Sequence, residues 1–525
     1  MTLPLFRLFH ACPRWVRGLL LAGGLATSAL QGDETRPPVT VDLLQRRERY
    51  QEASTRTLKA FHQFRFTNRV EASGIRFEHH IVDDAGRNYQ AAHYDHGNGV
   101  AAADVDGDGR VDLYFTTQLG RNELWRNAGG GRFEDITARS GVGLTNPIAV
   151  GAAFGDIDNN GTPDLFVTTV RHGNHLFQNL GGGRFKDISA DAGVAHSGHS
   201  SGAIFFDYDN DGRLDLLVTQ VGVYTRDEVG PGGYYLALSD AFSGHLFHER
   251  TEYLRLYRNL GQGRFEEVSS ALNLRDGSWA GDVTFTDLNG DRFPDLYLPN
   301  MQGDDHYYEN QQGRSFRDRT AELFPKTPWG STGAQFFDFN QDGRMDLLVT
   351  DMHSDMTQRQ TEDSLGLRPV IEKTKSEAYC SQQWTEEYLQ GSTNNLFGNA
   401  LFLNRGDRAF QEISDAVGVE TYWPWGASVG DLNADGFEDL VITAGMGFPF
   451  RYAVNSVLLN DAGRRFYDVE FLLGVEPRSG PLGKVWFTLD CSGADRTNAR
   501  CAGKTGLVPV YGSLSSRSSV LADLD

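Results

Sequence analysis

The segment DVDGDGRVDLYF, residues 104–115, indicates the fold of the chain, because its pattern returns five more times along the sequence. Each copy places Asp or Asn at alternate positions of a tight turn, between two short runs of alternating apolar residues. Such runs are typical of β-strands, so the repeating unit is a strand, an Asp loop and a second strand. The other copies are DIDNNGTPDLFV (156–167), DYDNDGRLDLLV (207–218), DLNGDRFPDLYL (287–298), DFNQDGRMDLLV (338–349) and DLNADGFEDLVI (431–442), and residues 523–525 begin a seventh.

A second element alternates with the loops. It consists of an Asn, a glycine-rich turn and a Phe that leads another alternating strand, as in RNAGGGRFEDIT (126–137). The segment FTNRVEASGI (66–75) matches FEDITARSGV (133–142) but precedes every loop, so it is expected to supply the outer strand of the last repeat. Six further strands of this kind begin at Phe133, Phe185, Phe265, Phe316, Phe410 and Phe466.

The spacing of the repeats indicates the architecture. Successive loops begin 52, 51, 80, 51, 93 and 92 residues apart, which gives a base period near 51. The surplus residues form insertions near 221–254, 351–396 and 474–515. About four short strands per period is typical of a β-propeller blade, whereas helical solenoids need a 3.6-residue apolar period that is absent here. The sequence predicts an all-β fold, a seven-bladed β-propeller over residues 65–525.

The two ends of the repeat region carry further expectations. Residues 41–64 have an apolar stripe at roughly helical spacing, so within the 30–64 segment we expect a short helix that packs on the propeller. At the other end, the strand 519–522 leads into Asp523 and Asp525 only. We therefore expect the last blade to be incomplete in this chain, with a further loop and strand pair needed to close the ring.

Residues 1–29 have the features of a signal peptide. Arg7, Arg14 and Arg17 precede the apolar stretch 19–30, and Thr27 and Ala29 are small residues at the spacing of a cleavage site. The stretch is short for a bilayer span, although an uncleaved signal anchor is the alternative. No second hydrophobic segment follows, so the protein is predicted to be secreted, extracellular or periplasmic, without a membrane span after signal removal.

The cysteines agree with export. Cys491 and Cys501 form the one local pair, whereas Cys12 lies in the signal segment and Cys380 stands alone. An oxidising compartment favours a loop-closing disulfide between Cys491 and Cys501 over a metal site, which would need two more ligands. Two free thiols are the alternative.

The Asp loops point to calcium. Five of the six full loops have the form D-x-[DN]-x-[DN]-G-x-x-D, and closely packed oxygen ligands of this kind suit a hard cation. Carboxylates at alternate positions repel one another unless a cation lies between them. Polar hairpin turns are the alternative, but six copies at a fixed phase favour metal sites. In the fourth loop Arg292 replaces the Gly of the left-handed turn, so this loop is expected to be the weakest site.

The predicted ligands include the residue at the seventh position of each loop, which would contribute its main-chain carbonyl. In loops one to three they are Asp104, Asp106, Asp108, Arg110, Asp112, Asp156, Asp158, Asn160, Thr162, Asp164, Asp207, Asp209, Asp211, Arg213 and Asp215. In loops four to seven they are Asp287, Asn289, Asp291, Phe293, Asp295, Asp338, Asn340, Asp342, Arg344, Asp346, Asp431, Asn433, Asp435, Phe437, Asp439, Asp523 and Asp525.

The loops also explain the charge of the chain. They hold 22 acidic residues, which matches the formal net charge of −21. The acidity therefore belongs to the predicted metal sites and not to a surface for a cationic partner. Without a basic surface the chain cannot displace counterions from phosphates, which excludes ordinary nucleic-acid binding.

These motifs resemble a known family. The Asp loops look like the FG-GAP or VCBS repeats of integrin α-subunit propellers and of many bacterial exported proteins. The segments DHGNGVAAADVDGDGRVDLYF (95–115) and WFTLDCSGADRTNARCAGKTG (486–506) are similar to the ASPIC/UnbV, or cartilage acidic protein-like, family. The resemblance runs from about residue 66 to the end and implies a seven-bladed calcium propeller. Family members usually continue into a small C-terminal domain, which this sequence does not reach.

Three functions are compatible with this sequence. We favour an interaction or adhesion scaffold that binds a protein or glycan ligand at the cell surface or in the envelope, because rigid scaffolds with variable insertions commonly build recognition surfaces. The aromatic residues Tyr379, Trp384 and Tyr388 make the insertion 351–396 a candidate contact surface, with a lid packed on the propeller as the alternative. The other functions are a propeller enzyme with a His and Asp site at the channel mouth and a structural component of a cell-surface assembly.

No catalytic residue is predicted. A G-x-S-x-G signature and a phosphate-binding glycine loop are both absent from the sequence, and the GGGRF turns lack the strand-to-helix context of a nucleotide site. The groups that an enzyme would use are spaced three apart or clustered in one turn, where they are usually solvated. They are His172 and His175, His196 and His199, His245 and His248, and Asp304, Asp305 and His306.

Overall fold

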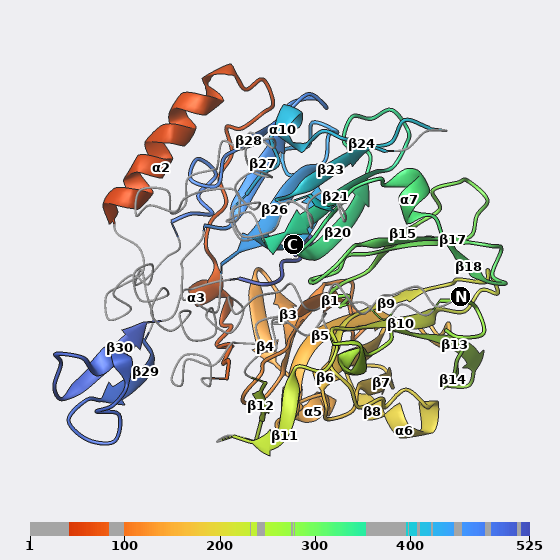
Figure 1. The fold of residues 1–525 in the computed structure, drawn as a ribbon, viewed down its shortest axis with the longest axis horizontal. Coiled ribbons are helices and arrows are strands. Elements are labelled where there is room, and N and C mark those ends of the chain that lie inside the picture. Colours follow the sequence, from red (N-terminus) through yellow and green to blue (C-terminus); the bar gives the residue numbers. More distant parts are fainter. Residues whose placement is uncertain are drawn as a thin grey trace, which may run out of the picture.

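The computed structural model describes residues 41–82, 99–230, 233–238, 247–274, 277, 279–352, 395–396, 398–406, 410–421, 424–445, 454–477, 485–511 and 516–524. Their strands form six four-stranded antiparallel sheets, which are the blades of a β-propeller (Figure 1). The all-β propeller fold predicted from the sequence is therefore confirmed. The sequence predicted seven blades, and the described residues form six complete ones.

Each blade takes its four strands in chain order. Blade one comprises β1 (Val100–Ala103), β2 (Asp112–Phe115), β3 (Glu123–Gly129) and β4 (Arg132–Asp135). Blade two comprises β5 (Ile148–Gly155), β6 (Asp164–Val170), β7 (His175–Asn179) and β8 (Phe185–Asp187). Blade three comprises β9 (Ser200–Phe206), β10 (Asp215–Gln220), β13 (Arg255–Gly261) and β14 (Arg264–Glu267). Blade four comprises β15 (Thr284–Thr286), β16 (Asp295–Leu298), β17 (His306–Asn310) and β18 (Phe316–Asp318). Blade five comprises β20 (Ser331–Phe337), β21 (Asp346–Asp351), β23 (Ala400–Leu403) and β24 (Gln411–Glu412). Blade six comprises β25 (Pro424–Gly430), β26 (Asp439–Ala444), β27 (Ser456–Asn460) and β28 (Phe466–Asp468).

The hydrophobic core lies between blades. Between blades one and two, Tyr114 and Leu124 pack with Leu165 and Phe177. Equivalent apolar clusters fill the next four interfaces of the ring. Because both faces of the second strand are covered, β6, β10, β16 and β21 are buried along their whole length. This explains why these strands have continuous apolar runs, which the sequence shows as DLFV, DLLV and DLYL.

A ring of glycines lines the centre, where the first strands approach one another. A Cβ atom on Gly151 of β5 would lie only 3.0 Å from the carbonyl oxygen of Ser201 in the next blade. The Thr168 hydroxyl accepts a hydrogen bond from the Gly151 amide (2.8 Å) and donates to the same Ser201 oxygen (2.6 Å), so it joins the two blades. Blade four departs from this pattern, because Asp282 takes the place of the glycine and Pro299 the place of the threonine.

Four-residue helices follow the fourth strand in four blades: α5 (Thr137–Ser140), α6 (Ser189–Ala192), α7 (Thr320–Leu323) and α10 (Ser414–Val417). An Asp or Glu at the end of the strand begins the helix, as where Asp135 Oδ1 accepts a hydrogen bond from the Thr137 amide at 2.9 Å and Glu412 Oε1 from the Ser414 amide at 2.8 Å. The left-handed Gly141, with a φ of 82°, ends it. These helices were not predicted, because one turn is too short to show an apolar period.

The N-terminal segment packs on blade six. Helix α2 (Val41–Ser54) and a 3-10 turn, η3 (Thr55–Thr57), are followed by extended chain, so the predicted helix ends ten residues before the predicted boundary at residue 64. Arg47 forms a buried ion pair with Glu470 at 2.7 Å, and Gln51 Oε1 accepts a hydrogen bond from the Phe471 amide at 3.0 Å. The predicted packing of a short helix on the propeller is confirmed.

The two chain segments outside the blades lie beside blade one and blade six. The segment 66–75, predicted as an outer strand, forms no strand in the structure, because no described strand pairs with it. It contains helix α3 (Val70–Ser73), and the Phe66 amide donates to the Leu473 carbonyl at 2.7 Å. Residues 516–524 run along β25, where the Gly426 amide donates to the Arg517 carbonyl at 3.0 Å. The Asn127 side chain of β3 reaches the same segment and donates to the Leu524 carbonyl at 3.0 Å.

The insertions form small additions to the blades. The first contains the hairpin β11 (Thr225–Val229) and β12 (Tyr235–Ala237) and the turn η5 (His248–Arg250). The third contains β29 (Val485–Asp490), β30 (Leu507–Tyr511) and η7 (Ala499–Cys501), closed by the predicted disulfide between Cys491 and Cys501. The second lies almost wholly outside the described residues, apart from β22 (Asn395–Leu396), which pairs with β19 (Thr327–Pro328). None of the described helices combines the length and apolar character needed to cross a membrane.

Candidate metal-binding loops

Each Asp loop joins the first strand of a blade to the second, so all six loops lie at the same end of their blades. The turn requires a left-handed residue at its sixth position, which is Gly109 in loop one, with a φ of 84°. Arg292 adopts the same conformation in loop four, with a φ of 77°. The left-handed strain that the sequence predicted for this loop is present, and an L-residue there costs about 1 to 2 kcal/mol.

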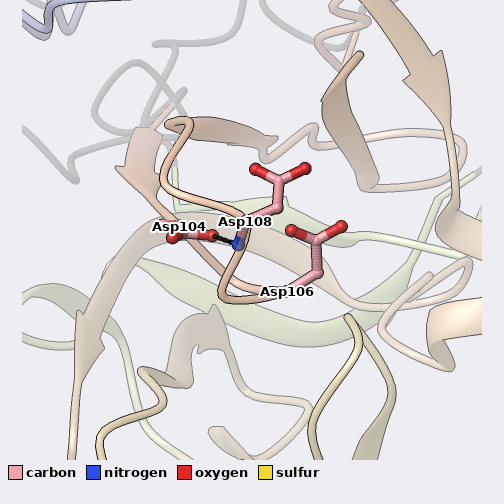
Figure 2. Close-up of side chains that lie close together, drawn as sticks. All are labelled: Asp104, Asp106 and Asp108. Atoms are coloured by element: carbon pink, nitrogen blue, oxygen red, sulfur yellow. Dashed lines mark hydrogen bonds between the residues drawn. The ribbon is translucent and has the colours of Figure 1, made fainter. Parts of the chain in front are cut away.

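The first Asp of each loop folds the turn. Asp104 Oδ1 accepts hydrogen bonds from the amides of Gly107 (2.8 Å) and Asp108 (3.1 Å), and its Oδ2 accepts from Gly109 (2.7 Å). Figure 2 shows Asp104 lying in the plane of the turn, whereas the carboxylates of Asp106 and Asp108 project together from one side of it. The first Asp therefore has a structural role whether or not a cation is bound.

The Asp at the ninth position begins the second strand and is fully buried in all six loops. Asp112 Oδ2 accepts a hydrogen bond from the Val105 amide (3.0 Å), and its Oδ1 accepts from the Asn127 amide on the third strand (2.7 Å). Burial raises the pKa of Asp112 to about 6 and that of Asp215 to about 7. A nearby positive charge would favour the ionised form of these carboxyls.

Three loops bring carboxylate oxygens close enough for one ion. One oxygen from each of three acids lies within 4.8 Å of the others in the sets Asp104, Asp106, Asp108; Asp156, Asp158, Asp164; and Asp207, Asp209, Asp215. Two buried oxygens, Asp106 Oδ1 and Asp209 Oδ1, have no hydrogen-bond partner and occupy equivalent positions in loops one and three. A buried carboxylate oxygen without a donor is a favourable ligand for a hard cation, so these residues fit calcium.

Loops four to six keep the same turn with an amide at the third position. Asn289 Oδ1 accepts a hydrogen bond from the Asp291 amide at 2.9 Å, and Asn433 makes the same contact with Asp435 at 3.1 Å. Among the described residues these loops do not bring three carboxylate oxygens within 4.8 Å of one another. In the seventh loop Asp523 is described, whereas Asp525 lies outside the described residues.

The Asn of the glycine-rich turn connects blades two, three, four and six to the blade before each of them. Asn179 Nδ2 donates to the Val105 carbonyl of loop one at 2.9 Å and to the Pro163 carbonyl of its own loop at 3.0 Å. Asn259, Asn310 and Asn460 likewise donate a side-chain hydrogen bond to the carbonyl of the second residue of the preceding loop. The sequence shows this Asn as a repeat, but its role depends on how the blades stack.

The residue before that Asn was missed by sequence reasoning. Arg126 of β3 contacts Asp106 and lies 2.5 Å from Asp108 Oδ2. Arg258 of β13 lies 2.8 Å from Asp209 Oδ2. Gln178 of β7 donates to Asp158 Oδ2 at 2.9 Å. These side chains reach the loops from the third strand, some 20 residues or more away in sequence, so loop spacing could not identify them.

The histidines that an enzyme would use do not gather at one site among the described residues. His175 lies 2.9 Å from Asp187, His199 lies 3.2 Å from Glu252 and His306 lies 3.1 Å from Asp318, in blades two, three and four respectively. His245 lies outside the described residues. A pocket of about 370 Å³ beside α7 is lined by Asp304, His306 and Asp318, among others.

Comparison with protein families identifies the repeats. A model described as an FG-GAP-like repeat matches residues 104–167, 156–218, 238–298, 287–349 and 388–442, which together exceed half of the chain. A model described as an FG-GAP repeat matches residues 423–463. All six full Asp loops fall within the first set, and the sixth also lies in the second match.

Relatives of known name agree with the resemblance predicted from the sequence. Cartilage acidic protein 1 of Mus musculus is 25% identical over 301 residues, which cover 52% of this chain and 42% of that protein. Cartilage acidic protein 1 of Homo sapiens is 26% identical over 137 residues, which cover 24% of this chain and 20% of that protein. The chain thus spans less than half the length of these relatives.

Two solved structures align at low identity. The computationally designed Ika8 protein aligns with a TM-score of 0.34 and 8% identity over 72% of this chain and 74% of its own. The V. cholerae biofilm matrix protein Bap1 aligns with a TM-score of 0.27 and 15% identity over 50% of this chain and 37% of its own.

Proposed function

This chain belongs to the FG-GAP-like repeat family, and on that basis we propose that it is an exported, calcium-binding β-propeller that binds a protein or glycan partner and does not catalyse a reaction. The observation that supports the calcium role is the pair of equivalent buried oxygens without donors, Asp106 Oδ1 and Asp209 Oδ1. In each loop the acids at the first, third, fifth and ninth positions and the carbonyl at the seventh would hold the ion. Bound calcium supplies the positive charge that lets these carboxylates remain together.

The topology separates the calcium loops from the proposed binding surface. The Asp loops connect first to second strands, whereas the insertions follow β10, β21 and β28, which are second or fourth strands. In an antiparallel blade these connections lie at the end opposite to the Asp loops. We therefore place the recognition surface on the insertion face, and the calcium loops on the other face as structural supports.

We also infer that the two outer segments contribute to a seventh blade. The Gly426 amide donates to Arg517 as the Gly99 amide of blade one donates to Val150, at 3.0 Å in both cases. The Phe66 amide donates to Leu473 as Phe316 does to Leu272, at 2.7 Å in both cases. These matches support residues 516–524 as the inner strand and residues 66–74 as the outer element of a seventh position in the ring.

The interaction role is tested by capture of a partner from the envelope fraction or medium of the source cells, with calcium and with chelator. The matched variant replaces Asp227, Glu228 and Val229 at the tip of the β11–β12 hairpin with Ser, since all three are exposed. We expect capture by the wild type in calcium, and reduced capture by the variant. The control is Arg132→Ser on the face that carries the Asp loops, and it should capture the partner as well as the wild type does. If the hairpin variant also captures as much as the wild type, the recognition surface has been assigned to the wrong face.

A further inference from the structure

In two of the Asp loops an arginine from the third strand of the blade contacts the loop carboxylates. The guanidinium of Arg126 contacts the carboxylates of Asp106 and Asp108 in loop one. In loop three Arg258 Nη2 lies 2.8 Å from Asp209 Oδ2 and 3.6 Å from Asp211 Oδ2. Both arginines come from the third strand of the blade, immediately before the Asn that connects the blades. They therefore stand beside the acids that would hold a cation.

The six loops divide into two groups at this position. Where the third loop residue is Asp, the facing residue is a hydrogen-bond donor: Arg126, Gln178 and Arg258 face Asp106, Asp158 and Asp209. Where the third loop residue is Asn, the residue at the corresponding position has no donor: Glu309, Leu403 and Leu459 correspond to Asn289, Asn340 and Asn433. The side chain on the third strand is thus matched to the charge of the loop.

The arginines do not satisfy the acids completely. Asp106 Oδ1 and Asp209 Oδ1 remain buried without a partner, and so does Arg258 Nε. Arg110 and Arg213, at the seventh positions of the same two loops, also contact Asp108 and Asp211. Each loop therefore has two guanidinium groups, whereas four Asp side chains lie at its first, third, fifth and ninth positions. A divalent cation at the same carboxylates would be repelled by a guanidinium that stayed in contact with them.

We propose that Arg126 and Arg258 are built-in counter-ions that hold loops one and three together when calcium is absent and must leave the carboxylates when it binds. This inference rests on the proposed calcium function. Loops one and three consequently bind calcium more weakly than their four carboxylates would suggest, but they stay folded at low calcium. Loop two, with the neutral Gln178, is the natural reference because it lacks the competing charge.

The test is calcium titration calorimetry of the purified protein and of Arg126→Gln and Arg258→Gln, which install the residue of loop two. The controls are Arg132→Gln and Arg264→Gln, exposed arginines on the fourth strands of the same blades. We expect one site in each test variant to bind calcium about tenfold more tightly, because a positive charge beside the ion is removed. In chelator the same variants should melt several degrees below their controls.

The two proposals fail separately. If the wild type binds calcium and both Gln variants titrate and melt like their controls, the counter-ion proposal is wrong while the calcium function stands. If the wild type takes up no calcium, the proposed function is wrong, and so is the proposed competition between the arginines and calcium. The melts in chelator then show whether the arginines stabilise the loops on their own. Arg126→Lys, which keeps the charge, should retain the weaker affinity and guards against a general packing effect.

Discussion

At the scale of single residues, Asp305 is the clearest departure from the repeat. It occupies the position of Asn122 in blade one, and in each case a side-chain oxygen accepts a hydrogen bond from the amide five residues earlier, at 2.7 Å and 2.9 Å. Asn174, Asn399 and Asn455 hold the same position in three other blades. The Tyr297 and Ser331 hydroxyls also donate to Asp305, each at 2.8 Å. Burial raises the pKa of Asp305 to about 8.

This pKa predicts how stability depends on pH. Because the folded pKa of Asp305 lies above the unfolded value of about 3.9, the folded state binds more protons, and the free energy of unfolding falls as pH rises from about 4 to 8. Asp305→Asn removes this contribution. We expect the variant to gain about 1 to 3 kcal/mol relative to the wild type between pH 5 and pH 8, as measured by urea unfolding at both values.

The matched control is Asp304→Asn, the same substitution at the neighbouring exposed residue. Other buried carboxyls, such as Asp215, also titrate in this range, so the comparison is the difference between variant and wild type. A difference that is the same at pH 5 and pH 8 would show that Asp305 keeps its charge in the folded protein.

At the scale of elements, the third strand connects the blades. Its Asn is buried in all six blades. In blades two, three, four and six this Asn donates a hydrogen bond to the preceding Asp loop. Asn179→Ala leaves the carbonyls of Val105 and Pro163 without this donor, and unsatisfied buried groups cost about 1 to 3 kcal/mol each. We expect a loss of that order in urea unfolding, whereas Lys186→Ala on the exposed side of β8 should have little effect.

The same Asn→Ala substitution in blade one tests whether residues 516–524 occupy the place of a seventh blade. Asn127 donates to Leu524, which belongs to the segment 516–524 rather than to a complete blade. If this segment holds the inner place of a seventh blade, Asn127→Ala should cost as much as Asn179→Ala. A cost no larger than that of Lys186→Ala would remove the segment from the ring.

The elements also show what the sequence could predict. The turns of the Asp loops, the strands at the six Phe residues that follow the loops, and the disulfide were predicted correctly, because their residues are fixed by local chemistry: left-handed glycines, alternating apolar runs and paired cysteines. The end of α2 was not, because Leu58 and Ala60 leave the helix to pack on Val457 and Leu459 of blade six. The Arg126 contact was also missed, since it depends on the strand register that pairs Leu113 of β2 with Trp125 of β3.

At the scale of the whole molecule, the Asp loops should govern stability if they bind calcium as proposed. They share one end of the propeller, and each holds the first and second strands of its blade. At a free calcium concentration about ten times the dissociation constant, each independent site adds about 1.4 kcal/mol by mass action. Several sites together would contribute an amount comparable to the net stability of a typical domain, about 5 to 15 kcal/mol.

The measurement is a thermal melt of the purified protein in chelator and then with calcium, magnesium or zinc restored separately. Calcium should raise the midpoint most, because the candidate ligands are all oxygens in a flexible arrangement. Magnesium should raise it less, since it requires a tighter octahedral site, and zinc little, since it prefers nitrogen and sulfur. A midpoint that does not respond to chelator would make the six loops plain turns.

The hydrogen bonds by which the third-strand Asn residues join neighbouring blades have a consequence for how the chain folds. Asn259 joins Ile157 across 102 residues of chain, Asn310 joins Tyr208 across 102, and Asn460 joins Phe339 across 121. None of these bonds can form until a whole further blade has been synthesised. Until the next blade is present, the apolar face that it will cover stays exposed. The ring therefore has to close in the order in which its blades become available.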